Sequence, residues 1–217
     1  MKYFIFSIDD GTIYDKRSSE ILNQYHLKAT FNLNSGMDDF VWYKGETEIR
    51  RLILKDNLSI YDGHEIASHS LFHRYMSALS KEEIYNEVYL DKKNLESLFS
   101  KEVITFAFPF DDYSPYPIEV IKNIKGIKLI RTSRIDQSFK IPNNRYDIPI
   151  TSWNILEALN LFDEFIKNPN SELFIFVSHS YDFIDDNYQS FIKLCQKVSS
   201  SKDIKVITMS ELDNIIH

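Results

Sequence analysis

The chain has 217 residues, of which 43% are hydrophobic and 14% aromatic, so it can bury a substantial core, and no linker rich in proline, glycine or serine divides it. We therefore expect one domain over residues 1–217. The net charge of −7 argues against nucleic acid as a partner, and the single Cys195 rules out an intramolecular disulfide and a cysteine-rich zinc site.

Neither a signal peptide nor a membrane span is expected. The apolar start, Met1–Phe6, is short and is soon interrupted by Asp9 and Asp10. No run approaches the roughly 18 apolar residues that a span requires. We expect a soluble, cytoplasmic protein with no membrane partner, and the sequence leaves its oligomeric state open.

Short apolar runs alternate with segments of helical period along the whole chain. In the first half we expect a strand over Lys2–Ile8, a helix over Lys16–His26, a strand over Thr30–Leu33, a helix over Glu46–Lys55 and a strand over Glu65–Ser68. A capping-box pattern, Ser80 followed by Glu83, then opens a helix that reaches about Phe99.

The second half repeats this alternation. We expect strands over Val103–Phe108, Lys128–Thr132, Tyr146–Ile150, Leu173–Val177 and Ile204–Thr208. The helices between and after them are Pro117–Ile124, Asn154–Ile166, Asn187–Val198 and a short terminal one. Strands that alternate with helices indicate βαβ units and a parallel α/β sheet, either open and doubly wound or closed into a barrel. In both architectures ligands bind at the carboxyl ends of the strands.

Candidate site residues follow several of the predicted strands directly. Asp9 and Asp10 end the first strand, His69 follows the third, Pro109 and Phe110 follow the fourth, and His179 follows Leu173–Val177. Each could serve only as a local cap. Taken together, they predict a cleft where metal-binding and titratable groups meet.

His69 and His73 are four residues apart, a spacing that would bring both imidazoles onto one face if the backbone turns helically. Two histidines make half of a metal site, because a catalytic zinc ion usually has three protein ligands and one open position. The Asp9–Asp10 pair is the candidate source of the third ligand.

Four segments resemble successive motifs of one family. Ser7–Thr12, Gly63–His73, Phe106–Phe110 and Phe176–Ser180 look like those of the polysaccharide deacetylases, the NodB-homology domain of carbohydrate esterase family four. The resemblance implies a distorted (β/α)7 barrel. It also implies that Asp10, His69 and His73 hold a divalent metal, that Asp9 is the general base and that His179 is the general acid.

The implied reaction is hydrolytic removal of acetyl groups from an N-acetylated, or O-acetylated, sugar or oligosaccharide. Zinc is the expected metal, with cobalt or manganese as alternatives, because it activates water and polarises the carbonyl. The backbone N–H of Phe110, placed where the family uses a tyrosine N–H, would stabilise the oxyanion.

The chain also departs from the family pattern. Many members carry an arginine that pairs with the base aspartate, and Ala107 occupies that position here, so we expect Arg131 or Arg145 to take its place. The fourth motif is not clear. Supporting or substrate-contacting residues are expected among Pro109, Asp147, Trp153 and Asp182. Trp153 could instead pack the barrel, and Asp182 could either orient His179 or cap a turn.

Three other functions share some of these sequence features. A haloacid-dehalogenase-type phosphatase needs aspartates two residues apart, and Ile8 stands where the first would be. A related hydrolase of another non-peptide C–N bond, of the cyclic imide or ureide type, would keep the metal site and change the pocket. A non-catalytic carbohydrate-binding relative would use the cleft without turnover.

Overall fold

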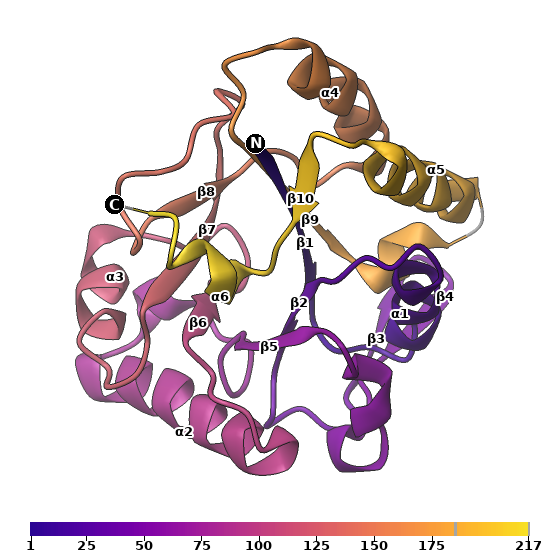
Figure 1. Cartoon of the computed structure of the whole chain (residues 1–217). Coiled ribbons are helices and arrows are strands. Elements are labelled where there is room, and N and C mark those ends of the chain that lie inside the picture. The colour runs from indigo at the N-terminus through magenta and orange to yellow at the C-terminus, as the bar shows by residue number, and fades with distance from the viewer. Residues whose placement is uncertain (185, 217) are drawn as a thin grey trace.

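The computed structural model describes residues 1–184 and 186–216, and parallel strands surrounded by helices form its centre (Figure 1). The strands of the main sheet are β1 (Lys2–Asp9), β2 (Thr30–Leu33), β5 (Glu65–Ser68), β6 (Thr105–Ala107), β7 (Leu129–Ile135), β8 (Ile148–Ile150), β9 (Leu173–His179) and β10 (Ile204–Val206). Every recorded pairing in this sheet is parallel, as the βαβ pattern predicts.

The sheet curls into an incomplete barrel. Its order is β10-β1-β2-β5-β6-β7-β8, and β9 pairs with β1 along seven residues on the opposite edge. A single bridge, Ser152 to Phe176, joins the segment after β8 to β9. Seven strands, β1, β2 and β5 to β9, therefore surround the interior, while β10 pairs only with the start of β1. The predicted distorted (β/α)7 barrel is confirmed, and the open doubly wound sheet is not found.

Strand alternation separates two apolar layers. Phe4 and Phe6 face outward into one cluster with Phe162 of α4 (Ile155–Lys167) and Phe191 of α5 (Asp186–Ser200). Ile5 belongs to a second cluster, which contains residues of β7, β8 and β9 and therefore lies inside the barrel. With side chains alternating between faces, Ser7 and Asp9 also point inward. The interior thus changes from apolar to polar toward the carboxyl ends of the strands.

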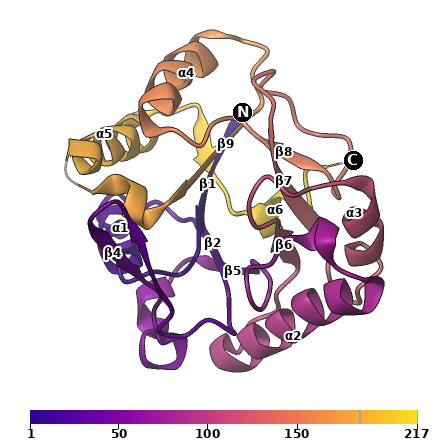
Figure 2. The same cartoon turned by 180° about the vertical axis from the view of Figure 1, so that it is seen from behind.

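The other helices are α1 (Asp15–Gln24), α2 (Lys81–Phe99), α3 (Pro115–Ile121) and α6 (Met209–Leu212). The predicted capping box of α2 is confirmed: the Ser80 side chain accepts from Glu83 N–H. Figure 2 shows α2 and α3 together on one side, with α4 and α5 grouped on another. Helix α6 closes the amino end of the barrel, where Met209 N–H donates to Thr30 Oγ1 at the start of β2. No helix in the described residues is long and apolar enough to cross a membrane.

The helix predicted over Glu46–Lys55 is wrong. Residues there form the second half of an antiparallel hairpin, β3 (Val41–Lys44) and β4 (Thr47–Arg50), followed by two short 3₁₀ turns, Leu54–Asp56 and Leu58–Tyr61. Gly45, with φ +63°, opens the two-residue turn between the strands. Pairing between Trp42 and Ile49 then outweighs the helical preference of the charged residues.

Candidate metal centre and catalytic cleft

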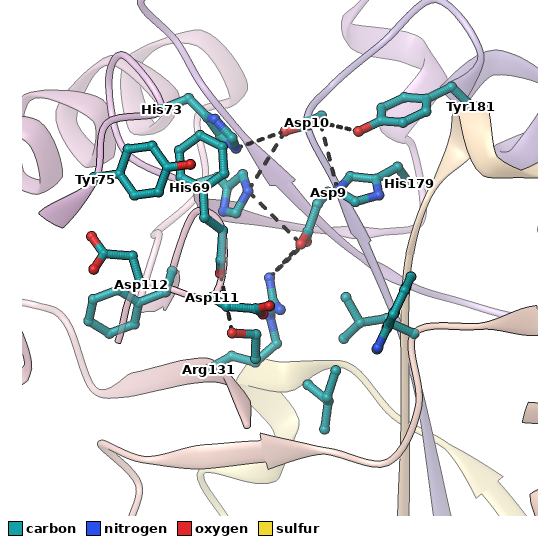
Figure 3. A pocket seen from close by; sticks show the side chains of 16 residues that line it. Asp9, Asp10, His69, His73, Tyr75, Asp111, Asp112, Arg131, His179 and Tyr181 are labelled. Atoms are coloured by element: carbon teal, nitrogen blue, oxygen red, sulfur yellow. Dashed lines mark hydrogen bonds and ion pairs between the residues drawn. The ribbon is translucent and has the colours of Figure 1, made fainter. Parts of the chain in front are cut away.

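A cavity of about 630 Å³ opens at the carboxyl ends of the strands. Asp9, Asp10, His69, His73, Arg131 and His179 all line it, and Figure 3 shows their side chains converging from different parts of the chain. The expected cleft at the strand ends is therefore present, and Asp9, Asp10, His69, Phe110 and His179 line it.

The two carboxylates reach the cleft by different means. Asp9 ends β1 on its inward face, whereas Asp10 adopts φ +88°, a left-handed conformation that is uncommon outside glycine. The turn at Asp10 brings the second side chain into the cavity as well. Both residues are buried, 5% and 4% exposed. Neighbouring residues of a regular strand would face opposite sides, so the left-handed turn is what pairs them.

His69 and His73 do not share a helix, so the helical turn that could have brought them onto one face is not present. They lie in an irregular loop after β5, in which Ser70 has φ +69° and His73 has φ +49°. The rings still meet, with centroids 5.0 Å apart. His69 Nδ1 lies 2.9 Å from the carbonyl oxygen of Ala107, so this nitrogen carries the proton and Nε2 is left free as a ligand atom.

Asp10, His69 and His73 fit a divalent ion. Each offers one ligand atom, and these atoms lie within 4.8 Å of one another. Asp10 Oδ1 is 3.2 Å from His73 Nε2 and 3.8 Å from His69 Nε2. Donors bound to one tetrahedral zinc ion at about 2.1 Å would be about 3.4 Å apart, so only small movements would be needed.

The charge states of this triad also suit a metal. Burial lowers the pKa of His69 to about 3, which leaves the imidazole neutral, as metal binding requires. Burial alone would raise the pKa of Asp10, but the Arg51 guanidinium and the hydrogen bond to His73 outweigh it. The pKa of this carboxyl is therefore held well below its usual range, and an ionised ligand is available.

Arg131 lies where the arginine missing at position 107 would be needed. Its Nη2 donates to both oxygens of Asp9, at 2.9 and 2.7 Å, and its side chain is fully buried. Asn32 Nδ2 donates a third hydrogen bond to Asp9 Oδ1, at 2.7 Å. The alternative, Arg145, is wrong as a partner of Asp9, because its guanidinium pairs with Asp213 at 2.6 Å outside the cleft.

His179 has a carboxylate partner three residues further along the chain. Its Nδ1 lies 2.8 Å from Asp182 Oδ2, while its Nε2 faces Asp10 Oδ2 at 3.8 Å. Burial by itself would lower the pKa of His179, but the hydrogen bond to Asp182 and the charges of Asp10 and Asp9 raise it to about 9. The ring is therefore protonated at neutral pH.

Asp147, the other candidate carboxylate, does not reach His179. It pairs with Arg134 at 3.2 Å. Asp182 makes both of the contacts that were considered, because it accepts from the ring of His179 at 2.8 Å and caps the turn by accepting the His179 backbone N–H at 3.2 Å.

The rim of the cleft is aromatic. Phe110, at φ +56°, packs its ring against His73 with centroids 4.4 Å apart and stacks on Tyr75 at 4.0 Å. Trp153 lines the same cavity and is 59% exposed, so it does not pack the barrel. Pro109 precedes Phe110 and does not line the cavity. Within residues 1–184 and 186–216, the Phe110 N–H makes no hydrogen bond to a protein acceptor.

Several site residues were missed from the sequence, among them Asn32 and Tyr75 described above. Arg51 and Tyr181 each donate to a carboxylate oxygen of Asp10, at 3.0 and 2.9 Å, and Asn34 bonds to the loop of His69. Tyr181 lies directly after the last motif, and its ring stacks on His179 at 4.7 Å, so its position was a usable signal. No local pattern singles out Arg51 or Asn34.

The sequence matches a family model and a curated relative. The family model for polysaccharide deacetylase matches residues 2–126. The uncharacterized protein YlxY of Bacillus subtilis is 26% identical over 120 residues, which are 55% of this chain and 34% of that protein, so the chain spans about a third of this curated relative.

Solved structures match over nearly the whole chain. A family 4 acetyl xylan esterase from Clostridium thermocellum, in complex with a cobalt ion, is 15% identical with a TM-score of 0.63, over 99% of this chain and 91% of that one. A family 4 carbohydrate esterase from Bacillus anthracis is 16% identical with a TM-score of 0.65, over 98% and 83%. A family 4 pseudoenzyme, also from Bacillus anthracis, is 18% identical with a TM-score of 0.62, over 98% and 65%. At such identities the likeness shows the fold alone.

Proposed function

The chain belongs to the polysaccharide deacetylase family, and on that premise we propose that it is a metal-dependent hydrolase that removes acetyl groups from an N-acetylated sugar or oligosaccharide. The observation that carries the proposal is the convergence of Asp10, His69 and His73, whose ligand atoms lie within 4.8 Å of one another. Asp9 and His179 flank this triad in the same cavity, where a base and an acid are required.

Asp10, His69 and His73 would hold the ion, for which we propose zinc, with cobalt or manganese as alternatives. Such an ion polarises a carbonyl and lowers the pKa of water from 15.7 to about 7. The cobalt ion in the Clostridium thermocellum esterase supports cobalt as a working substitute. Proton transfer, oxyanion stabilisation and sugar binding are assigned to the residues that surround these three.

Asp9 is the proposed general base. Arg131 and Asn32 hold its carboxylate with three hydrogen bonds, so its orientation is set before substrate arrives. Asp9 Oδ2 lies 3.9 Å from His69 Nε2, beside the proposed metal ligands. From this position it would accept a proton from the attacking water.

His179 is the proposed general acid. An acetamide has a poor leaving group, so the departing nitrogen must receive a proton. The pKa of His179, raised to about 9 by Asp182, Asp10 and Asp9 against the effect of burial, keeps that proton in place at neutral pH. With Nδ1 held by Asp182, Nε2 is the nitrogen that faces the cleft and can donate.

Oxyanion stabilisation and sugar binding are assigned to the rim. The Phe110 N–H is free of protein acceptors in the described part of the chain, and one well-aimed donor contributes about 2.7–4 kcal/mol to transition-state stabilisation. The exposed faces of Tyr75 and Trp153 provide aromatic surfaces on which a sugar ring can stack. An O-acetylated sugar would fit the same chemistry, because its carbonyl is attacked in the same way.

A non-catalytic carbohydrate-binding role is the second candidate. It is favoured by the pseudoenzyme of similar fold and by Ala107 in place of the usual arginine. Ala107 does not leave the proposed base without an arginine, because Arg131 from another strand pairs with Asp9.

Acetate release tests the proposal. The purified chain would be loaded with Zn²⁺, Co²⁺ or Mn²⁺ and offered N-acetylated and O-acetylated sugars of increasing length, with cyclic imides and ureides as separate substrates. We expect acetate from a sugar, and a loss of at least 100-fold in Asp9→Asn. Turnover of only the cyclic substrates, sugar binding without acetate, or an Asp9→Asn variant as active as the parent would contradict it.

A further inference from the structure

Arg51 connects the hairpin to the proposed metal centre. Its side chain is 4% exposed, and Nη2 donates to Asp10 Oδ1 at 3.0 Å. Nη1 donates both to the backbone carbonyl of Asp10 and to Asn34 Oδ1. One guanidinium therefore binds the side chain and the main chain of the same proposed ligand, and also a residue from another loop.

Asn34 continues this connection to the histidine loop. It is 3% exposed and follows β2, which lies between β1 and β5 in the sheet. Its Nδ2 donates to the carbonyl oxygens of His69, at 2.5 Å, and Ser70, at 2.8 Å. A buried network thus runs from the end of β1, through Arg51 and Asn34, to the end of β5.

The same backbone positions are strained. Asp10 and Ser70 are non-glycine residues with φ of +88° and +69°, a conformation that persists only where surrounding contacts hold it. Arg51 binds the carbonyl oxygen of Asp10, and Asn34 binds that of Ser70. The network therefore bonds to the main chain at the two strained residues, one of which is itself a proposed ligand.

We propose that Arg51, acting through Asn34, is the positioning residue of the metal centre, fixing the loops of Asp10 and His69 in their ligating geometry before an ion binds. The inference rests on the proposed function in taking Asp10, His69 and His73 as the metal ligands. The positive charge of Arg51 opposes a nearby cation, so its geometric and electrostatic effects on metal affinity have opposite signs. Lysine keeps the charge but lacks the planar fork, and therefore separates them.

The test is Co²⁺ binding to the metal-free full chain, followed by calorimetry and by visible absorption of the bound ion. We expect Arg51→Lys to bind Co²⁺ about 10- to 100-fold more weakly than wild type and with an altered spectrum, as outer-shell changes generally do. Asn34→Ala, which keeps Arg51 and all three proposed ligands, should weaken binding in the same direction. Arg50→Lys is the matched control, because Arg50 pairs with Asp39 and Glu48 at the surface and should bind Co²⁺ as wild type does.

Arg51→Met removes both the fork and the charge, so the difference in Co²⁺ affinity between Arg51→Lys and Arg51→Met reports the charge effect. Binding by Arg51→Lys at wild-type affinity or tighter, with an unchanged Co²⁺ spectrum, would overturn the inference and leave Arg51 as a neutralising charge only. Circular dichroism identifies any variant that does not fold. If the Arg51 variants do not fold, Asn34→Ala remains as the test, and Co²⁺ binding by Asn34→Ala at wild-type affinity would overturn the inference. A wild-type chain that binds no Co²⁺ would instead refute the metal site itself, so the two failures are distinguishable.

Discussion

Arg131 of β7 donates both of its Nη2 hydrogen bonds to Asp9 of β1, at 2.9 and 2.7 Å, across a sequence separation of 122 residues. In the sheet, Arg131 is the register partner of Ala107, where the family pattern places an arginine. Both side chains are buried, and strand alternation turns both inward. The arginine that holds the proposed base is therefore displaced by one strand in this chain.

Because Arg131 takes the place of an arginine at position 107, an arginine introduced at position 107 should rescue the loss of Arg131. Arg131→Ala should lower kcat/KM at least 100-fold, because a misplaced base is costly even at about 1 Å. Adding Ala107→Arg to that variant should raise kcat/KM at least tenfold. The deleted Arg131 side chain leaves room beside position 107 for a guanidinium that can reach Asp9.

Deacetylation kinetics of the single and double variants provide the measurement. Arg134→Ala serves as control, because Arg134 is on the same strand and pairs with Asp147 outside the Asp9 network. Full activity of Arg131→Ala would show that Asp9 does not depend on the pair.

The bond between Asp182 and His179 predicts a shift in pH dependence. Asp182 is the main group that raises the pKa of His179 against the effect of burial. Asp182→Asn keeps a hydrogen-bond acceptor and removes the charge, so the folded-state pKa of His179 should fall. The acid would then lose its proton at lower pH, and the alkaline limb of the kcat/KM profile should move to lower pH.

Asp147→Asn is the matched control for this profile, because Asp147 pairs with Arg134 and not with His179. The assignment of His179 as the acid would fail if the alkaline limbs of Asp182→Asn and wild type coincided.

Trp153 predicts a specific effect on substrate affinity. Its exposed ring lines the cleft and is not among the proposed ligands, so Trp153→Ala should raise KM for an oligosaccharide about tenfold, consistent with roughly 0.5–1.5 kcal/mol for a stacked aromatic pair. The kcat value should change little. Leu156→Ala, at an equally exposed residue of α4 outside the cleft, should leave both constants unchanged. An unaltered KM in Trp153→Ala would remove this residue from the sugar site.

The buried side chain of His64 should make the folded protein less stable in acid. Its Nδ1 accepts Ala29 N–H and its Nε2 contacts Ser19 Oγ, and burial lowers its pKa from 6.5 to about 4. Between these values the unfolded chain binds more protons than the folded one, so stability falls as the pH drops from about 6.5 to about 4. The loss from this group reaches at most about 3 kcal/mol.

Urea unfolding at several pH values in that window measures the effect. His64→Gln should show a shallower decline than wild type, because glutamine does not titrate. Equal slopes for the two proteins would contradict the assignment.

Alternation along the strands made part of this site predictable. Asp9 and His179 end apolar runs that are recognisable without a structure, and the same rule favours Arg131, which follows the inward Leu129 by two residues. Arg145 lies in a loop before β8, where side chains do not alternate between two faces as they do along a strand. Asp182 was within reach as well, because it is only three residues from its partner.

The remaining features depend on tertiary contacts. The left-handed turns at Asp10, Ser70 and His73 could not be predicted from residue type, because these residues have no strong intrinsic preference for the left-handed conformation. The hairpin was mistaken for a helix because its charged residues have fair helical propensity, and its pairing is settled only by burial of Ile49. Arg51 could not be selected over Arg50 from sequence, since only the folded chain brings it to Asp10.

Metal-dependent acetate release tests the central claim most directly. Chelation should abolish acetate release from an N-acetylated oligosaccharide, and one equivalent of Zn²⁺ or Co²⁺ per chain should restore it. His69→Ala, which removes one proposed ligand, should stay inactive after the same addition. Acetate release that survives complete removal of metal, or that returns in His69→Ala as fully as in wild type, would contradict the account.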